Sequence, residues 1–382
     1  MNKQTFLWGS IPSEWTIQNL NELTTYISRG KQPKYVDYSE IRALNQKAIR
    51  WGFIDNSVLK YHNPEVKVDE KHFIKKGDVV INSTGTGTVG RTYYFGYSPE
   101  QIFADSHVTL VRTNSEVLNP QFLMYQLSTK AYQHFIEGSF LAGSTGQVEF
   151  NKSKVQQLPI LLPTISEQNS IANILSSLDE KIELNNQMNE TLEEIAEGLF
   201  KRWFVDFEFP NEEGQPYKSS GGEMVESELG MIPYNWKSGV LGDLIYVQNG
   251  YAFKGKDLME HGEVGIIKIK NISSNTVDII NTQYISEILA SKVDTKFKLC
   301  GTNLLIAMTG AEVGKIGLVP LNKKELYLNQ RVGCIKELVP GGESYAYNYL
   351  LRPEAQEMIQ AKAVGSAQPN ISGGCKIKCV NS

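Results

Sequence analysis

The central stretch, Pro163–Phe207, reads PTISEQNSIANILSSLDEKIELNNQMNETLEEIAEGLFKRWFVDF and decides how this chain is organised. Thr164 and Glu167 have the spacing of a capping box, in which a hydroxyl and a carboxylate satisfy backbone N–H groups of the first helical turn. No proline follows until Pro210. The pattern therefore predicts one helix over 163–208, of about 40 residues and roughly 60 Å.

Apolar residues recur along this predicted helix in a heptad pattern, which is typical of a coiled-coil seam. A polar Asn185 near the middle would fix the register of such a seam at some cost in stability. The alternative is a helix packed on a neighbouring domain. The expected seam consists of Ile171, Ile174, Leu178, Ile182, Asn185, Met188, Leu192, Ile195 and Leu199.

The flanks of the helix contain an internal repeat. The segment Ile11-Pro12-Ser13-Glu14-Trp15 recurs as Ile232-Pro233-Tyr234-Asn235-Trp236, and VVINSTG at 79–85 recurs as LLIAMTG at 304–310. Gly143-Ser144 with Gln147 recurs as Gly365-Ser366 with Gln368. Three landmarks in one order predict two copies of a domain of about 150 residues.

The repeat and the helix together predict the domain organisation. The fold class is α+β, with two β-rich domains of mixed α/β structure joined by a long coiled-coil-type helix. We expect a first domain over 1–160, the helix over 163–208, a linker over 209–231, a second domain over 232–372 and a tail over 373–382.

A glycine-rich loop raises the question of nucleotide binding. Gly85 and Gly90-Arg91-Thr92 have nearly the spacing of a P-loop, but Arg91 replaces the lysine and an aromatic strand pattern follows where a P-loop needs a helix. In the second copy, the loop is one residue shorter. We therefore favour a glycine hairpin between two strands over an NTPase site.

Composition favours a cytoplasmic protein without membrane attachment. The chain has 382 residues, of which 41% are hydrophobic, and contains four cysteines. No apolar run approaches the roughly 18 residues that a membrane span needs. Cys375 and Cys379 have no histidine nearby, and the histidines lack metal-ligand spacing. We expect no metal site and no catalytic residues.

The net charge of −4 hides a segregation along the chain. Residues 1–160 carry 17 basic and 14 acidic side chains, and residues 241–382 carry 16 and 13, so each repeat has a net charge of +3. Residues 163–209 carry 3 and 10, a net charge of −7. Because screening acts over roughly 8 Å, each basic domain could still hold phosphates. The alternative is ordinary solvated surface.

Several motifs resemble the specificity subunit of type I restriction-modification systems. Residues 158–182 and 198–207 are similar to the central conserved region of that family, and Gly365–Ser372 is similar to its domain-closing signature. The resemblance covers nearly the whole chain. It implies two target recognition domains, each of which reads one half of a bipartite DNA site, and a helix that spaces them.

The resemblance also implies the partners. Double-stranded DNA would be the ligand, and methyltransferase (modification) subunits would bind the conserved helix. S-adenosylmethionine, ATP and Mg²⁺ would belong to these subunits and to a restriction or motor subunit, so this chain would carry no cofactor. A homodimer through the central helix is a further expectation.

DNA-contacting residues are expected in loops rich in basic, amide and hydroxyl side chains, because such side chains can reach phosphates and the edges of DNA bases. These positions follow from residue chemistry and the repeat, and for each the alternative is a turn residue or a solvated charge. The candidates are Arg29, Lys31, Gln32, Lys34, Tyr35, Ser83, Thr84, Thr86, Arg91, Ser144, Gln147, Tyr251, Lys254, Lys256, Thr309, Lys315, Ser366, Gln368 and Asn370.

One departure from the family pattern concerns the end of the sequence. The family pattern continues into a second long helix that pairs with the first, whereas this sequence stops at Ser382, which we interpret as truncation. Two hypotheses stay open at this point. The chain is a recognition subunit of a restriction-modification complex, or it is a silenced recognition cassette with only a structural or interaction role.

Overall fold

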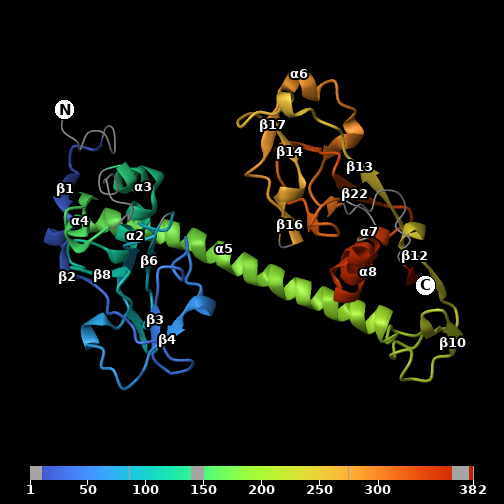
Figure 1. The fold of residues 1–382 in the computed structure, drawn as a ribbon, viewed down its shortest axis with the longest axis horizontal. Coiled ribbons are helices and arrows are strands. Elements are labelled where there is room, and N and C mark those ends of the chain that lie inside the picture. The colour runs from blue at the N-terminus through green and yellow to red at the C-terminus, as the bar shows by residue number, and fades with distance from the viewer. Residues whose placement is uncertain (1–10, 86, 139–149, 274, 364–377, 382) are drawn as a thin grey trace. The chain divides into compact units, whose positions relative to one another are not determined.

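The computed structural model describes residues 11–85, 87–138, 150–273, 275–363 and 378–381. The chain divides into two compact units, Met1–Gln187 and Met188–Ser382. Helix α5 (Ile165–Phe200) begins in the first unit and ends in the second (Figure 1). Each unit mixes sheets with helices, which confirms the predicted α+β class.

Helix α5 begins with the predicted capping box. The Thr164 N–H donates to the Glu167 carboxylate at 2.9 Å, and the Glu167 N–H donates to Oγ1 of Thr164 at 3.3 Å. The buried Gln168 amide donates to the carbonyl oxygens of Val117 and Pro163, both at 3.0 Å, and so anchors the first turn. The helix continues as a π-helical segment, Lys201–Val205. The prediction of one long helix is therefore confirmed.

The elements of the first domain are β1 (Thr16–Asn19), β2 (Thr24–Arg29), β3 (Arg42–Leu44), β4 (Lys60–Tyr61), β5 (Val79–Asn82), β6 (Thr92–Tyr94), β7 (Ile102–Ala104), β8 (Val108–Thr113), α2 (Pro120–Ser128), α3 (Lys130–Ile136), α4 (Lys152–Gln156) and β9 (Pro159–Leu162). Its main sheet has the order β2-β8-β5-β6, a smaller sheet has the order β4-β3-β7, and β1 pairs antiparallel with β9.

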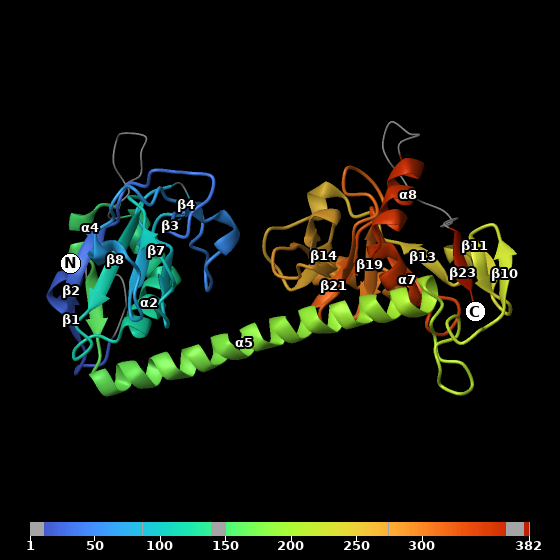
Figure 2. The same ribbon diagram turned by 90° about the horizontal axis from the view of Figure 1, so that it is seen from below.

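Strand β5 shows why the main sheet is covered on both faces. All four of its residues are buried. Val79 and Ile81 belong to one apolar cluster with residues of α2 and α3, whereas Val80 belongs to another with Leu44. Because successive side chains of a strand point to opposite faces, the unbroken apolar run requires cover on each side. Helix α2 lies beside this sheet in Figure 2.

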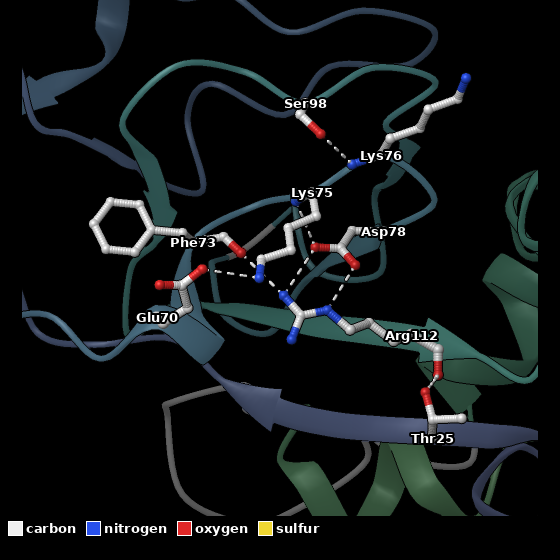
Figure 3. Close-up of polar contacts among 8 residues, drawn as sticks. All are labelled: Thr25, Glu70, Phe73, Lys75, Lys76, Asp78, Ser98 and Arg112. Carbon is white, nitrogen blue, oxygen red and sulfur yellow. Dashed lines mark hydrogen bonds and ion pairs between the residues drawn. The ribbon is translucent and has the colours of Figure 1, made fainter.

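A buried ion pair ties a loop to the main sheet (Figure 3). Nε of Arg112, on β8, lies 2.9 Å from Oδ1 of Asp78, and its Nη2 lies 3.2 Å from Oδ2 and donates to the Phe73 carbonyl at 2.9 Å. Asp78 also accepts the Lys75 N–H at 2.8 Å. The loop that leads into β5 is thus fixed by charge-assisted hydrogen bonds.

The second unit contains β10 (Met224–Ser227), β11 (Gly230–Pro233), β12 (Lys237–Val240), β13 (Ile245–Asn249), β14 (Val264–Ile267), β15 (Ile272–Ser273), β16 (Asn275–Val277), β17 (Gln283–Ile285), α6 (Glu287–Ala290), β18 (Lys298–Leu299), β19 (Leu304–Ala307), β20 (Ile316–Leu318), β21 (Glu325–Leu328), β22 (Val332–Glu337), α7 (Gly342–Leu351), α8 (Pro353–Ala363) and β23 (Lys378–Asn381).

The second unit repeats the topology of the first. The order β13-β22-β19-β20 corresponds to β2-β8-β5-β6, and β16 and β15 extend it at one edge. The parallel pair β14–β21 corresponds to β3–β7, and the pair β12–β23 corresponds to β1–β9. Two copies of one domain, as the repeated landmarks predict, account for this correspondence.

The flanks of the second domain differ from the predicted boundaries. The expected linker over 209–231 contains the hairpin of β10 and β11, and Phe209 stacks on Trp236 with ring centroids 5.0 Å apart. Residues 378–381, expected in the tail, form β23 and pair with β12. Because an edge strand such as β12 leaves unpaired backbone groups, a closing strand is needed there. Both segments are therefore parts of the second unit.

Candidate nucleic-acid interface

The basic loop after β2 lies against the end of β7. The Lys31 N–H donates to the Ala104 carbonyl at 3.0 Å, and the Gly30 N–H donates to the Val108 carbonyl at 3.0 Å. A Cβ atom on Gly30 would lie 1.9 Å from the Ala104 carbonyl oxygen, so only glycine fits at this crossing. The close approach holds Lys31 and Gln32 beside the turn between β7 and β8.

That turn, Asp105–His107, is organised by a buried carboxylate. Asp105 accepts the His107 N–H at 2.6 Å and is 1% exposed. Burial raises the pKa of the Asp105 carboxyl, although the His107 hydrogen bond opposes this effect. The fixed backbone leaves Ser106 partly exposed and His107 exposed to solvent.

Polar side chains from three loops meet around this turn. The Ser106 hydroxyl donates to the Gln32 amide oxygen at 2.6 Å, and the Thr84 hydroxyl lies 2.9 Å from Nδ1 of His107. Thr84 also donates to the Gln46 amide oxygen at 2.5 Å. Amides, hydroxyls and imidazoles of this kind can hydrogen-bond to base edges and phosphates.

The structure therefore brings two of the predicted residues, Gln32 and Thr84, into one cluster. It adds Gln46, Ser106 and His107, which the sequence analysis missed. The repeat indicates Ser106 and His107, because another polar run, Asn329-Gln330-Arg331, occupies the corresponding place in the second copy, between β21 and β22.

The remaining candidates of the first domain differ in exposure. Lys31, Lys34 and Tyr35 are exposed, and Nζ of Lys60 lies 4.9 Å from the centre of the Tyr35 ring. Arg29 and Arg91 are half-buried, and Arg91 donates to the Gly87 carbonyl at 3.2 Å.

Ser83 does not reach the surface, contrary to its selection as a DNA-contacting residue. It is fully buried, and its hydroxyl lies 2.6 Å from Oγ1 of Thr109 on the neighbouring strand β8. The sheet extends past the end of β5, so the side chain at 83 points inward. The candidates Thr86, Ser144 and Gln147 lie outside the described residues.

The second domain has the same close crossing. A Cβ atom on Gly250 would lie 2.3 Å from the Asn329 carbonyl oxygen, and the Tyr251 N–H donates to the Leu328 carbonyl at 2.8 Å. The Tyr251 ring packs edge-on against Phe253, with centroids 4.8 Å apart. The loop that carries Tyr251 thus corresponds to the loop that carries Lys31.

The other candidates of the second domain lie around this loop and the hairpin of β19 and β20. Lys254 and Lys256 are exposed, and Thr309 is half-buried. The Lys315 ammonium is paired with the Glu312 carboxylate at 2.6 Å, which reduces its availability to a phosphate. The candidates Ser366, Gln368 and Asn370 lie outside the described residues.

The glycine loops are hairpins, as predicted. Strands β5 and β6 pair antiparallel on either side of the loop that contains Gly85, and β19 and β20 pair antiparallel in the second domain. Thr92 begins the strand β6 instead of a helix. The described residues of this loop, Gly85 and 87–92, therefore lack the helix N-terminus that faces the phosphates in a P-loop.

The predicted seam of α5 is open to solvent over most of its length. Ile171 packs on the core of the first domain. The seam side chains from Ile174 to Leu199 other than Asn185 are 43% to 65% exposed, and Asn185 is exposed as well. Packing on a neighbouring domain therefore accounts only for the beginning of the stripe.

The described part of the chain was also considered for metal sites and membrane spans by its side-chain groups and helices, residues 11–85, 87–138, 150–273, 275–363 and 378–381. Within it, no group of three or more His, Cys, Asp or Glu side chains is arranged to hold a metal ion. Its helices also include none that is long and apolar enough to cross a membrane.

Comparisons with known proteins agree with the repeated architecture. The family model described as type I restriction modification DNA specificity domain matches residues 12–194 and 233–374. The HindI specificity subunit of Haemophilus influenzae is 30% identical over 223 residues, which cover 57% of this chain and 46% of that protein. The MjaVIII specificity subunit of Methanocaldococcus jannaschii is 24% identical over 369 residues, which cover 94% of this chain and 80% of that protein.

A solved structure supports the fold. The crystal structure of the type I restriction-modification S subunit from M. genitalium superimposes with a TM-score of 0.56 at 15% identity. The match covers 97% of this chain and 86% of that one.

Proposed function

The chain belongs to the type I restriction-modification DNA specificity family, and on that premise we propose that each of its two domains reads one half of a bipartite DNA target. The chain is a DNA-recognition subunit without catalytic activity of its own. The proposal that both domains read DNA is supported by one observation, the repetition of the candidate site in each domain. The sheet order, the glycine crossing and the polar turn beside it each occur once per domain.

The connecting helix would determine the number of unspecified base pairs between the two half-sites. Helix α5 has 36 residues, and at 1.5 Å per residue it is about 54 Å long. This length corresponds to about one and a half turns of B-DNA at roughly 34 Å per turn. A continuous helix is stiff enough to transmit such a length.

The open seam of α5 would dock a methyltransferase subunit. Soluble proteins rarely leave so long an apolar stripe uncovered, and the acidic surroundings of the stripe favour a basic partner. S-adenosylmethionine would then belong to the methyltransferase subunit, and ATP with Mg²⁺ to a restriction or motor subunit. A second copy of this chain, with its helix antiparallel to the first, is the competing occupant.

Co-expression with a methyltransferase subunit tests this proposal. We expect a stable complex that retains one DNA sequence over competitor DNA at physiological salt. A complex that binds all sequences equally would refute the recognition role. A chain that co-purifies only with itself would refute the partner assignment.

A further inference from the structure

Two corresponding turns present different side chains on the same framework. In the first domain, the turn between β7 and β8 presents Ser106 and His107. In the second domain, the turn between β21 and β22 presents Gln330 and Arg331, both exposed. Two domains that read different half-sites need such an arrangement, in which a shared framework carries different readers.

The backbone of each turn is held on both sides. On one side, the Ser83 N–H donates to the His107 carbonyl at 2.9 Å, and the Met308 N–H donates to the Arg331 carbonyl at 3.1 Å. On the other side, the loop that contains Gly30 or Gly250 crosses the turn of its domain. In the second domain, the Gln330 N–H donates to the Tyr251 carbonyl at 2.9 Å. Base readers need this kind of support, because a loose side chain cannot hold a bidentate geometry.

From this correspondence we infer that the two turns are sequence-reading elements and that Arg331 recognises a guanine in the half-site of the second domain. The inference rests on the proposed function. In the described part of the chain, no carboxylate forms an ion pair with the Arg331 guanidinium. Arginine binds O6 and N7 of guanine through two parallel hydrogen bonds, and glutamine binds N6 and N7 of adenine. The neighbouring Gln330 therefore suits an adjacent adenine.

The first domain would read its half-site through a network instead of a single arginine. Ser106 and His107 are already joined to Gln32 and Thr84, at 2.6 Å and 2.9 Å. Such linked groups present several donors and acceptors at fixed positions. The two domains should therefore select different half-sites.

Selection from randomised DNA duplexes by the full chain, assembled with its methyltransferase subunit, tests this inference. Arg331→Ala should abolish the guanine preference at one position, which corresponds to a loss of about 5-fold to 150-fold in discrimination. Arg331→Lys keeps the charge but loses the bidentate geometry, so it should retain binding to random DNA without that preference. Lys323→Ala, at the opposite end of β21, is the matched control and should leave the selected sequence unchanged.

The second part of the test transfers the side chains of Gln330 and Arg331 to the corresponding turn of the first domain. Ser106→Gln combined with His107→Arg should change the selected half-site of the first domain only. The inference is overturned if the Arg331 variants select the parent sequence, or if they weaken binding to all sequences equally, as loss of a phosphate contact would. Failure of the parent itself to select any sequence would instead refute the proposed function.

Discussion

Asp105 of the first domain and Asn329 of the second occupy equivalent positions in two corresponding turns. Each is buried, and each forms a parallel bridge to the residue after the crossing glycine, Lys31 or Tyr251. Each accepts the backbone N–H of the residue two positions later, at 2.6 Å in the first domain and at 3.5 Å in the second. A carboxylate and its neutral amide analogue therefore serve one structural role.

The first prediction concerns Asp105→Asn. Because burial raises the pKa of the Asp105 carboxyl, the folded chain binds this proton more tightly than the unfolded chain does. The stabilising contribution of Asp105 is thus full below the unfolded pKa, near 4, and is lost as the pH rises through the raised folded value. The asparagine variant should gain stability relative to the parent between pH 4 and pH 7. Melting temperatures at both pH values measure this.

Asp105→Ala serves as the contrast to the asparagine variant. It removes the carboxylate that accepts the His107 N–H, so it should cost about 1.5–3 kcal/mol of unfolding free energy at neutral pH. Equal stability of the alanine and asparagine variants would show that the hydrogen bond does not hold the turn.

The second prediction concerns the Arg112–Asp78 pair of Figure 3. Asp78 is 2% exposed, so Asp78→Ala leaves a partly buried guanidinium without its partner and should cost about 3–5 kcal/mol. Glu70→Ala breaks the exposed pair with Lys75, at 3.0 Å, and should cost less than about 1 kcal/mol. Denaturant unfolding compares the two variants, and similar losses would contradict the account.

The third prediction concerns phosphate contacts. Lys31→Ala and Lys254→Ala should weaken binding to all DNA sequences and lower the slope of log affinity against log salt by roughly one unit each. Lys76→Ala, an exposed lysine at the far end of β5 from Thr84, should leave the slope unchanged. Binding titrations over a range of salt concentrations measure the slope. Lys31 and Lys254 variants with the parent slope would remove these loops from the interface.

The fourth prediction concerns the seam of α5. Leu192 is 59% exposed, and Leu192→Asp should dissociate the partner-bound or dimeric form, because a charge would replace an apolar contact within the stripe. Ser176→Asp, at a heptad position opposite the seam, is the control. Light scattering gives the oligomeric state, and a parent chain that stays monomeric and soluble without any partner would contradict the open-seam account.

Local sequence patterns predicted the framework of the fold. The capping box at Thr164 fixes the start of α5 because both hydrogen bonds lie within one turn. The glycine hairpins are equally local. The repeat predicted two similar domains because one set of landmarks occurs twice.

The candidate site could be predicted only in part, because it depends on which strands become neighbours. Thr84 and His107 meet because strand β5 pairs with β8, so that Asn82 lies opposite Val108, 26 residues later in the sequence. Gln46 reaches Thr84 from another loop. Ser83, one residue before Thr84, is buried because successive side chains of an extended strand point to opposite faces. Composition identified the loops, but it could not assign the inward and outward side chains.

The central claim, that two readers are joined by a helical spacer, is tested most directly by lengthening α5. Insertion of one heptad after Asn185 preserves the phase of the seam and adds about 10 Å to the helix. DNA selection with the parent should yield two half-sites separated by a constant number of unspecified base pairs. The longer variant should select the same half-sites with about three additional base pairs between them, at 3.4 Å per pair. An unchanged spacing would contradict the account, as would a single continuous target.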